Sequence, residues 1–228
     1  MHVRLLPLVL RLFEFFTIAF SALLPVINPL GSAIIFLGLV GPADKVVYQH
    51  LARRIALFTI LFLMAVDLVG AVVLAFFGIS LPVIEVAGGL VLASMGWRLL
   101  NNPDPPDTSG STRATRSLAV LDSEVFYPFT FPLTAGPGAF VVTLTLAAHA
   151  EQPTTVASIF SQLGLFLAIV VLCVMIYFAY GYAPALARKI SPQTIHGILR
   201  MISFILLAIG VQIFWRGAEA LLQQAFPH

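Results

Sequence analysis

Long apolar stretches separated by shorter polar ones dominate the chain. Six of them reach the roughly 20 residues that a helix needs to cross the hydrocarbon core of a bilayer at about 1.5 Å per residue. The pattern therefore predicts an all-α integral membrane protein with six transmembrane helices. The predicted spans are Leu12–Val40, Arg54–Phe77, Pro82–Leu100, Phe126–Ala148, Val156–Tyr182 and Ile195–Trp215.

A polar, proline-rich stretch divides these spans into two groups of three. Residues 101–124 contain three prolines, a glycine and several serines and threonines, a composition typical of a flexible connection. We therefore predict a first three-helix repeat over residues 1–100, a flexible linker over 101–124 and a second three-helix repeat over 125–228.

Two of the predicted spans contain helix-breaking residues. The first motif is residues 25–31 (PVINPLG) and the second is residues 132–138 (PLTAGPG). Proline removes a backbone donor and clashes with the preceding turn, while glycine tolerates almost any dihedral, so neither segment should form a continuous helix. Backbone groups freed inside a bilayer must be buried in protein or line a wet cavity. The first and fourth helices are therefore predicted to be interrupted in mid-membrane.

The two halves share features in the same order. The two motifs lie 107 residues apart, and residues 84–96 (IEVAGGLVLASMG) pair loosely with residues 198–210 (ILRMISFILLAIG), 114 residues later. Such ordered pairs indicate an internal duplication. Because three spans per repeat is an odd number, the second repeat must be inverted in the membrane relative to the first. On the third span, Gly89, Ala93 and Gly96 share one face, which predicts the close approach of another helix.

Positive charge is unequal between the two predicted faces of the membrane. The face that includes the linker carries nine Lys and Arg residues and the other carries three, so the first face is predicted to be cytoplasmic and both termini to lie outside. The nine are Lys45, Arg53, Arg54, Arg98, Arg113, Arg116, Arg188, Lys189 and Arg200, and the three are Arg4, Arg11 and Arg216.

The composition agrees with a membrane protein and excludes several other classes. The chain is 60% hydrophobic and 10% charged, with a mean hydropathy of +1.01, whereas soluble domains carry about 25% charged residues. A net charge of +2 without a basic cluster gives no reason to expect a nucleic-acid partner. The single cysteine, Cys173, allows no internal disulfide. No two histidines have the spacing of metal ligands and no nucleotide motif is present, so we expect neither a metal site nor a cofactor.

The two interrupted segments are the predicted substrate site. An interrupted helix exposes N–H groups at one end and C=O groups at the other, and these suit the carboxylate and ammonium groups of a small zwitterion. Asn28 is the one strongly polar side chain of the first motif, and Thr134 is its nearest counterpart in the second. The predicted substrate-binding residues are Asn28, Pro29, Gly31, Thr134, Ala135, Gly136, Pro137 and Gly138.

Two charged residues are candidates for coupling or gating. Asp67 is the only carboxylate well inside a predicted span, where ionisable groups are costly and usually functional. It suits proton coupling, or it simply reaches water on the outer side. Arg200, near the start of the sixth span, is an interfacial anchor or attracts anionic groups of a substrate. A lone aspartate provides neither a carboxylate pair nor a nucleophile with its base, so no enzymatic activity is expected.

Several motifs resemble those of the MarC family of bacterial inner-membrane proteins. The resemblance covers nearly the whole chain apart from the linker and the extreme ends. It implies six spans, two inverted repeats and a place among proposed neutral amino-acid transporters that handle solutes such as glycine and alanine. Arg200 matches a position that is usually basic in the family, whereas Glu85 occupies a commonly basic position. The motifs are residues 28–31 (NPLG), 77–80 (FGIS) followed by 87–89 (AGG), 132–138 (PLTAGPG) and 210–212 (GVQ).

These features predict a secondary transporter of small neutral amino acids or similar polar solutes in the bacterial inner membrane. Coupling would use a proton or cation gradient or none, and a homo-oligomer is compatible with the sequence. An exporter or facilitator of another metabolite is one alternative. A non-transporting membrane scaffold is the other, and it would leave the two interrupted segments tightly packed rather than around a hydrated polar cavity.

Overall fold

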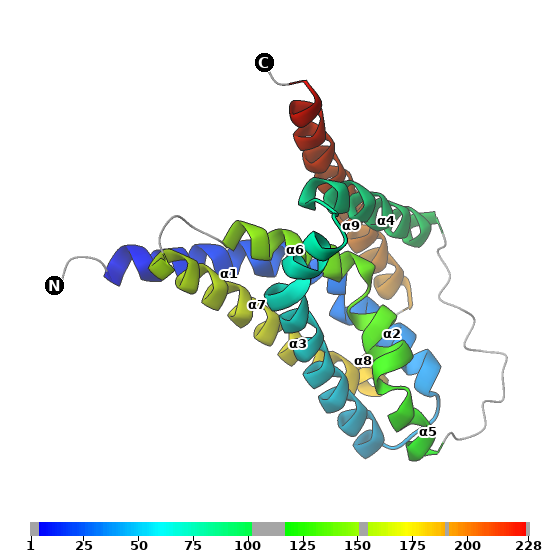
Figure 1. Ribbon diagram of the computed structural model, residues 1–228. Coiled ribbons are helices and arrows are strands. Elements are labelled where there is room, and N and C mark those ends of the chain that lie inside the picture. Colours follow the sequence, from blue (N-terminus) through cyan, green and yellow to red (C-terminus); the bar gives the residue numbers. More distant parts are fainter. Residues whose placement is uncertain (1–4, 102–116, 151–154, 190–191, 227–228) are drawn as a thin grey trace.

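In the computed structural model of the protein, which describes residues 5–101, 117–150, 155–189 and 192–226, every regular element is a helix (Figure 1). The elements are α1 (Leu5–Ile27), α2 (Pro29–Val40), α3 (Lys45–Phe76), α4 (Leu81–Asn101), α5 (Leu118–Ser123), η1 (Val125–Thr134), α6 (Pro137–Ala150), α7 (Thr155–Gly181), α8 (Ala183–Lys189) and α9 (Pro192–Ala225).

Each predicted span falls on a helix or on a broken pair of helices. α1 and α2 cover the first span and η1 and α6 the fourth. Across the described residues, four segments are long and apolar enough to cross a membrane, and the bent pair of η1 and α6 makes a fifth. α3 covers the second predicted span, but the count of six remains a prediction. The four segments are Pro7–Val40, Leu81–Asn101, Thr155–Gly181 and Arg200–Ala225.

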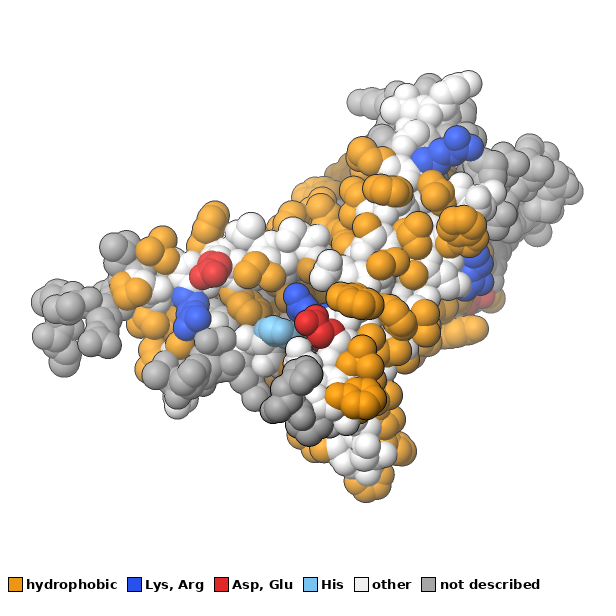
Figure 2. Space-filling model, turned by 90° about the horizontal axis from the view of Figure 1, so that it is seen from above, with side chains coloured by type: hydrophobic (Ala, Val, Ile, Leu, Met, Phe, Trp, Pro, Cys, Tyr) orange, Lys and Arg blue, Asp and Glu red, His pale blue; other side chains and the backbone are white. Residues whose placement is uncertain are grey.

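Much of the outer surface is apolar, as a lipid-facing surface must be. Figure 2 shows hydrophobic side chains spread over the exposed face of the molecule. Large residues such as Leu68, Phe76, Phe204 and Trp215 are at least 60% exposed. In water such a surface would drive association, whereas lipid tails solvate it.

α4 and α9 pack closely along small residues. A Cβ atom built on Gly89 or on Gly210 would lie 2.3 Å from a backbone nitrogen of the other helix. Gly96, late in α4, faces the first half of α9, while Gly217 of α9 faces the start of α4, so the two helices run antiparallel. The close approach predicted for the face of Gly89, Ala93 and Gly96 is confirmed.

α3 and α7 form a second antiparallel pair. Gly181, at the end of α7, lies against Gln49 near the start of α3. Near the other ends of the two helices, Gln162 of α7 lies against Asp67 of α3. α1 also packs on α7, because a Cβ on Gly164 would lie 2.7 Å from a carbonyl oxygen of α1.

An aromatic cluster fills the place where α2, α3, η1 and α7 meet. The ring of Phe36 stacks on that of Tyr180, with their centroids 4.5 Å apart. It meets Tyr48 and Phe129 edge-on, at centroid distances of 5.8 and 5.3 Å. All four side chains are fully buried, and this rigid contact holds the two interrupted segments at fixed positions.

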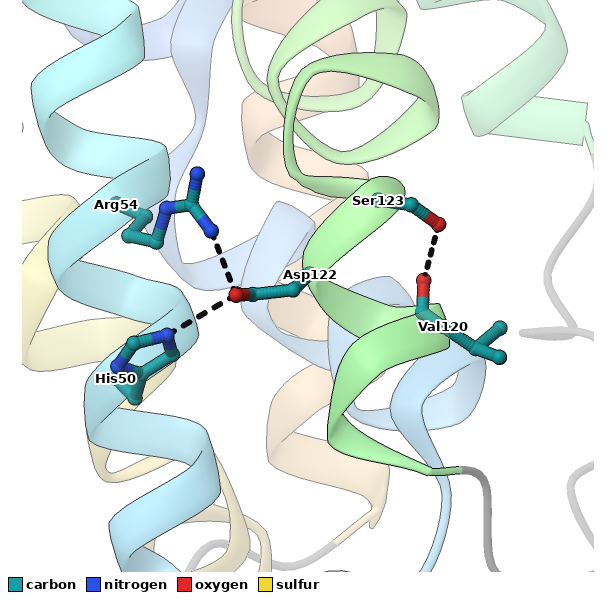
Figure 3. Close-up of polar contacts among 5 residues, drawn as sticks. All are labelled: His50, Arg54, Val120, Asp122 and Ser123. Carbon is teal, nitrogen blue, oxygen red and sulfur yellow. Dashed lines mark hydrogen bonds and ion pairs between the residues drawn. The ribbon is translucent and has the colours of Figure 1, made fainter.

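The end of the predicted linker is structured. Residues 102–116 lie outside the described residues, but α5 forms a helix where a flexible connection was expected. Asp122 of α5 forms an ion pair with Arg54 of α3 at 2.7 Å and lies 3.0 Å from Nε2 of His50 (Figure 3). Burial raises the pKa of Asp122, but the hydrogen bonds from Arg54 and His50 outweigh it and hold that pKa below its usual value. Asp122 is therefore ionised at neutral pH and ties α5 to α3.

Candidate functional site

The first break occupies one residue. α1 ends at Ile27 and α2 begins at Pro29, and Asn28 between them has φ 47° and ψ 66°. Asparagine tolerates this left-handed conformation better than most residues, and proline suits the first position of a helix. The structure thus has a local interruption at Asn28, while α1 and α2 together still form one apolar segment, Pro7–Val40. The break lies at Asn28 itself, whereas Pro25 is accommodated inside α1.

Side chains satisfy the backbone groups that this break releases. Oδ1 of Asn28 accepts a hydrogen bond from the Gly31 N–H at 3.0 Å, which is an N-cap interaction. The Ser32 hydroxyl donates to the Ile27 carbonyl at 2.9 Å and caps the end of α1. Asn28 is half-buried, and no described residue accepts a hydrogen bond from its Nδ2 amide. The Asn28 side chain is therefore both a helix cap and a donor that a ligand could use.

The second break is wider. η1 winds in wide turns through Thr134, α6 begins at Pro137, and the two meet at a 68° bend. Tyr127 and Phe131 have extended dihedrals inside η1, and each precedes a proline. The ring of a proline disfavours helical geometry in the residue before it. The predicted interruption of the fourth helix is confirmed, and the irregular stretch begins at Tyr127, five residues before the predicted motif.

Tyr180 of α7 connects the two breaks. Its hydroxyl lies 2.8 Å from Oγ1 of Thr134, just before the second break. It also interacts with the hydroxyl of Ser32, just after the first. Thr134 in turn donates to the Phe129 carbonyl at 2.6 Å. A continuous set of uncharged polar groups therefore runs between the breaks.

Sequence reasoning missed this role of Tyr180. Tyr177 and Tyr182 lie close to it in the chain, so all three have the pattern of an interfacial aromatic belt. Only the burial of Tyr180 distinguishes it, because Tyr182 is exposed and Tyr177 is partly exposed. No signal in the sequence could have identified it.

Most of the predicted substrate-binding residues lie together where the breaks approach each other. A Cβ built on Gly138 would lie 2.3 Å from a methyl group of Leu92 and 3.2 Å from one of Val26, which belongs to α1. A Cβ on Gly136 would lie 2.7 Å from the Pro132 carbonyl oxygen. Pro29, Gly31, Thr134, Ala135, Gly136 and Gly138 are buried, Asn28 is half-buried and Pro137 is exposed.

The two candidates for coupling or gating are separate from the breaks. Asp67 is half-buried on α3. With its amide nitrogen turned toward the carboxylate, Gln162 of α7 donates to both Asp67 oxygens, at 3.1 and 3.2 Å. Sequence reasoning did not name Gln162. Arg200 is exposed on α9, and among the described residues no contact connects it to the breaks.

Comparison with known proteins agrees with this architecture. A sequence profile of MarC family integral membrane proteins matches residues 13–222. The chain belongs to the MarC family. This MarC-family protein is therefore a multi-pass membrane protein embedded in a lipid bilayer.

Its curated relatives are inner-membrane proteins of bacteria. The inner membrane protein MarC of Escherichia coli K12 is 27% identical over 215 residues, covering 91% of this chain and 96% of the relative. MarC of Shigella flexneri shows the same identity and coverage. No solved structure matches the chain. The protein, like these relatives, is located in the bacterial inner membrane.

Proposed function

We propose that the protein is a secondary transporter of small neutral amino acids or similar small polar solutes, and that it has no enzymatic activity. One observation carries the proposal: two helices, one from each half of the chain, are broken at corresponding points, and the breaks come together. Ser32 and Thr134 lie on either side of Tyr180, and Gly138 lies against Val26. Paired broken helices at the contact between two repeats are the usual site of substrate in such transporters.

The helix pairs support two inverted repeats with six spans. α3 and α7 are the second helices of their halves, and α4 and α9 are the third. Each pair runs antiparallel and in direct contact, as expected for elements related by an axis in the membrane plane. In this proposal α3 also crosses the membrane, which brings the number of spans to six. Both termini then lie outside, according to the charge count. Rocking of one repeat against the other would give alternating access.

The groups at the breaks favour an uncharged solute. Asn28, Ser32, Thr134 and Tyr180 offer amide and hydroxyl groups, and none of them carries a charge at neutral pH. The residues around these groups include Gly31, Ala135, Gly136 and Gly138, which are small and buried. Glycine and alanine are therefore the solutes to test first.

Flux measurements test the proposal directly. Purified protein in proteoliposomes should give saturable uptake of glycine or alanine that is stimulated by the same solute inside the vesicle. Protein-free liposomes are the control for leakage. Efflux from preloaded vesicles separates an amino-acid importer from an exporter or facilitator, and a wider panel of metabolites extends the search. Absence of flux for every amino acid would overturn the proposal.

One observation favours a non-transporting scaffold. The contacts of Gly138 with Leu92 and Val26 leave no space for even a methyl group, so the second break is tightly packed. A transporter has to separate these contacts during its cycle, whereas a scaffold does not.

Asp67 is the proposed proton-coupling residue. Replacement by asparagine preserves the volume and still permits a hydrogen bond to Gln162, but it removes the titratable group. We expect Asp67→Asn to abolish stimulation of uptake by a pH gradient while exchange without a gradient continues. The control is Glu14→Gln, which removes an exposed carboxylate from α1. A pH dependence equal to that of the wild type would exclude Asp67 from coupling.

A further inference from the structure

Glu85 is an almost completely buried carboxylate with an unsatisfied oxygen. It lies in the first turns of α4 and is only 3% exposed. Its Oε1 atom has no hydrogen-bond partner among the described residues. A buried carboxylate oxygen without a partner costs considerable free energy. A donor that the described residues do not supply would remove this cost.

The position of Glu85 follows from the packing of α4. Gly88, one turn later, lies against Val141 of α6, and Gly217 of α9 lies against the Cβ of Glu85 itself. Glu85 and Gly88 belong to the same buried stripe of α4. The Glu85 side chain is therefore at the junction of α4, α6 and α9.

A second unsatisfied oxygen lies at the same level of this junction. Gly88 contacts Val141, and Leu92 contacts Gly138, so α4 and α6 run antiparallel in a register that places Glu85 beside Leu144 and Thr145. Thr145 is 7% exposed, and its hydroxyl has no partner among the described residues. Two buried oxygens on facing helices thus lack donors within the part of the chain that the structure describes.

An arginine and a histidine flank the junction. Arg216 of α9 and His149 of α6 both act electrostatically on Glu85. His149 is held in place by a 2.7 Å contact between its Nδ1 and the Thr145 carbonyl oxygen. Arg216 is exposed, as is Glu219 one turn further along α9.

We infer that the junction of Glu85, Thr145 and Arg216 binds a zwitterion that carries one ammonium and one carboxylate group. The ammonium donates to Oε1 of Glu85 and to the Thr145 hydroxyl, and the carboxylate faces Arg216 and His149. A bare metal cation is disfavoured by the positive charge of Arg216, and a simple anion is disfavoured by Glu85.

This inference rests on the proposed transport of neutral amino acids and extends it. The junction lies where α4 begins and α6 and α9 approach their ends, which the charge count assigns to the outer side. It is separate from the breaks, which lie two or more turns deeper along α6. It is therefore a first binding position for a solute that then moves to the centre.

The test isolates the junction from the breaks. Asn28→Asp, which retains the cap at the first break, serves as the background, and equilibrium binding of radiolabelled glycine to the purified full-length protein is measured. In this background the amide donors of Asn28 at the breaks are lost, and we expect glycine binding at the junction to remain. Glu85→Gln in the same background should weaken that affinity roughly tenfold to a hundredfold. Glu219→Gln is the control. It removes an exposed carboxylate near Arg216 at the end of α9, and it should leave the affinity unchanged. Methylamine and acetate, which each carry one of the two charges, should compete far less well than glycine.

The outcomes separate this inference from the transport proposal. Thr145→Val tests the same contact without changing a charge and should also weaken glycine binding, which covers the case in which Glu85→Gln fails to fold. Complete loss of glycine binding in folded Asn28→Asp would overturn the junction site and leave the central site supported. Unchanged affinity in both Glu85→Gln and Thr145→Val would also overturn it. Binding at the junction without any flux would support the inference and contradict the transporter.

Discussion

Replacing Gly210 by alanine is expected to destabilise the protein by about 3 kcal/mol, because the added methyl group has no space. A Cβ at this position would lie 2.3 Å from the backbone nitrogen of Ala93 and 2.9 Å from the carbonyl oxygen of Gly89. Backbone atoms cannot move aside as a flexible side chain can, so α4 and α9 would have to separate along their length. Gly89→Ala should have a similar effect, because its Cβ would lie 2.3 Å from the Phe214 nitrogen.

Gly197 provides a matched control on the same helix. Nothing lies within 4 Å of a Cβ built there, so Gly197→Ala should leave stability unchanged or raise it by up to about 1 kcal/mol through helix propensity. Thermal melting of the detergent-solubilised proteins, followed by size-exclusion chromatography, measures both effects. If Gly210→Ala melts at the same temperature as Gly197→Ala, the close packing of α4 on α9 is wrong.

Substitutions at Asn28 should have the largest effect on transport, and three of them separate its two roles. Asn28→Asp retains an N-cap oxygen and tolerates the left-handed backbone, but it removes the amide donors. Asn28→Gly retains the backbone freedom and loses the cap, at a cost of a few tenths of a kcal/mol. Asn28→Ala loses the cap and strains the backbone, at a total cost of about 2 kcal/mol. Stability should therefore fall in the order Asp, Gly, Ala.

Flux should follow a different order. If the Nδ2 amide of Asn28 binds solute, Asn28→Asp and Asn28→Gly should each reduce uptake roughly tenfold although both proteins remain folded. Counterflow of glycine and alanine in proteoliposomes, with protein amounts matched by melting behaviour, measures this. Wild-type flux in both variants would show that Asn28 only caps α2 and that the solute binds elsewhere.

The spans and the breaks were predictable because both follow from local physics. A bilayer requires about 20 apolar residues per helix, and each predicted span coincides with a helix or a broken pair. Proline and glycine predict that the helices are broken, but the residue at which each break occurs depends on the backbone preferences of the neighbouring residues. Pro25 is accommodated inside α1, and the turn occurs at Asn28, which tolerates a positive φ and caps the next helix. Tyr127 and Phe131 extend the second break because each precedes a proline.

The partners of the polar groups were not predictable. Tyr180 bridges Ser32 and Thr134, Gln162 pairs with Asp67, and Glu85 comes level with Thr145. Each set joins side chains from helices far apart in the sequence. Their meeting depends on the register of α4 on α6 and of α3 on α7, and close packing determines that register.

By itself, the sequence determined that this is a membrane protein and where its long apolar helices and their breaks lie, but not the short helix α5, since apolar length and backbone preference act within a few residues. The tertiary structure decided which helices pair, which hydroxyl connects the two breaks, and that one oxygen of the buried Glu85 has no partner among the described residues. The physical reason is one of range: an unsatisfied donor or acceptor is evident only when every neighbouring helix is in place.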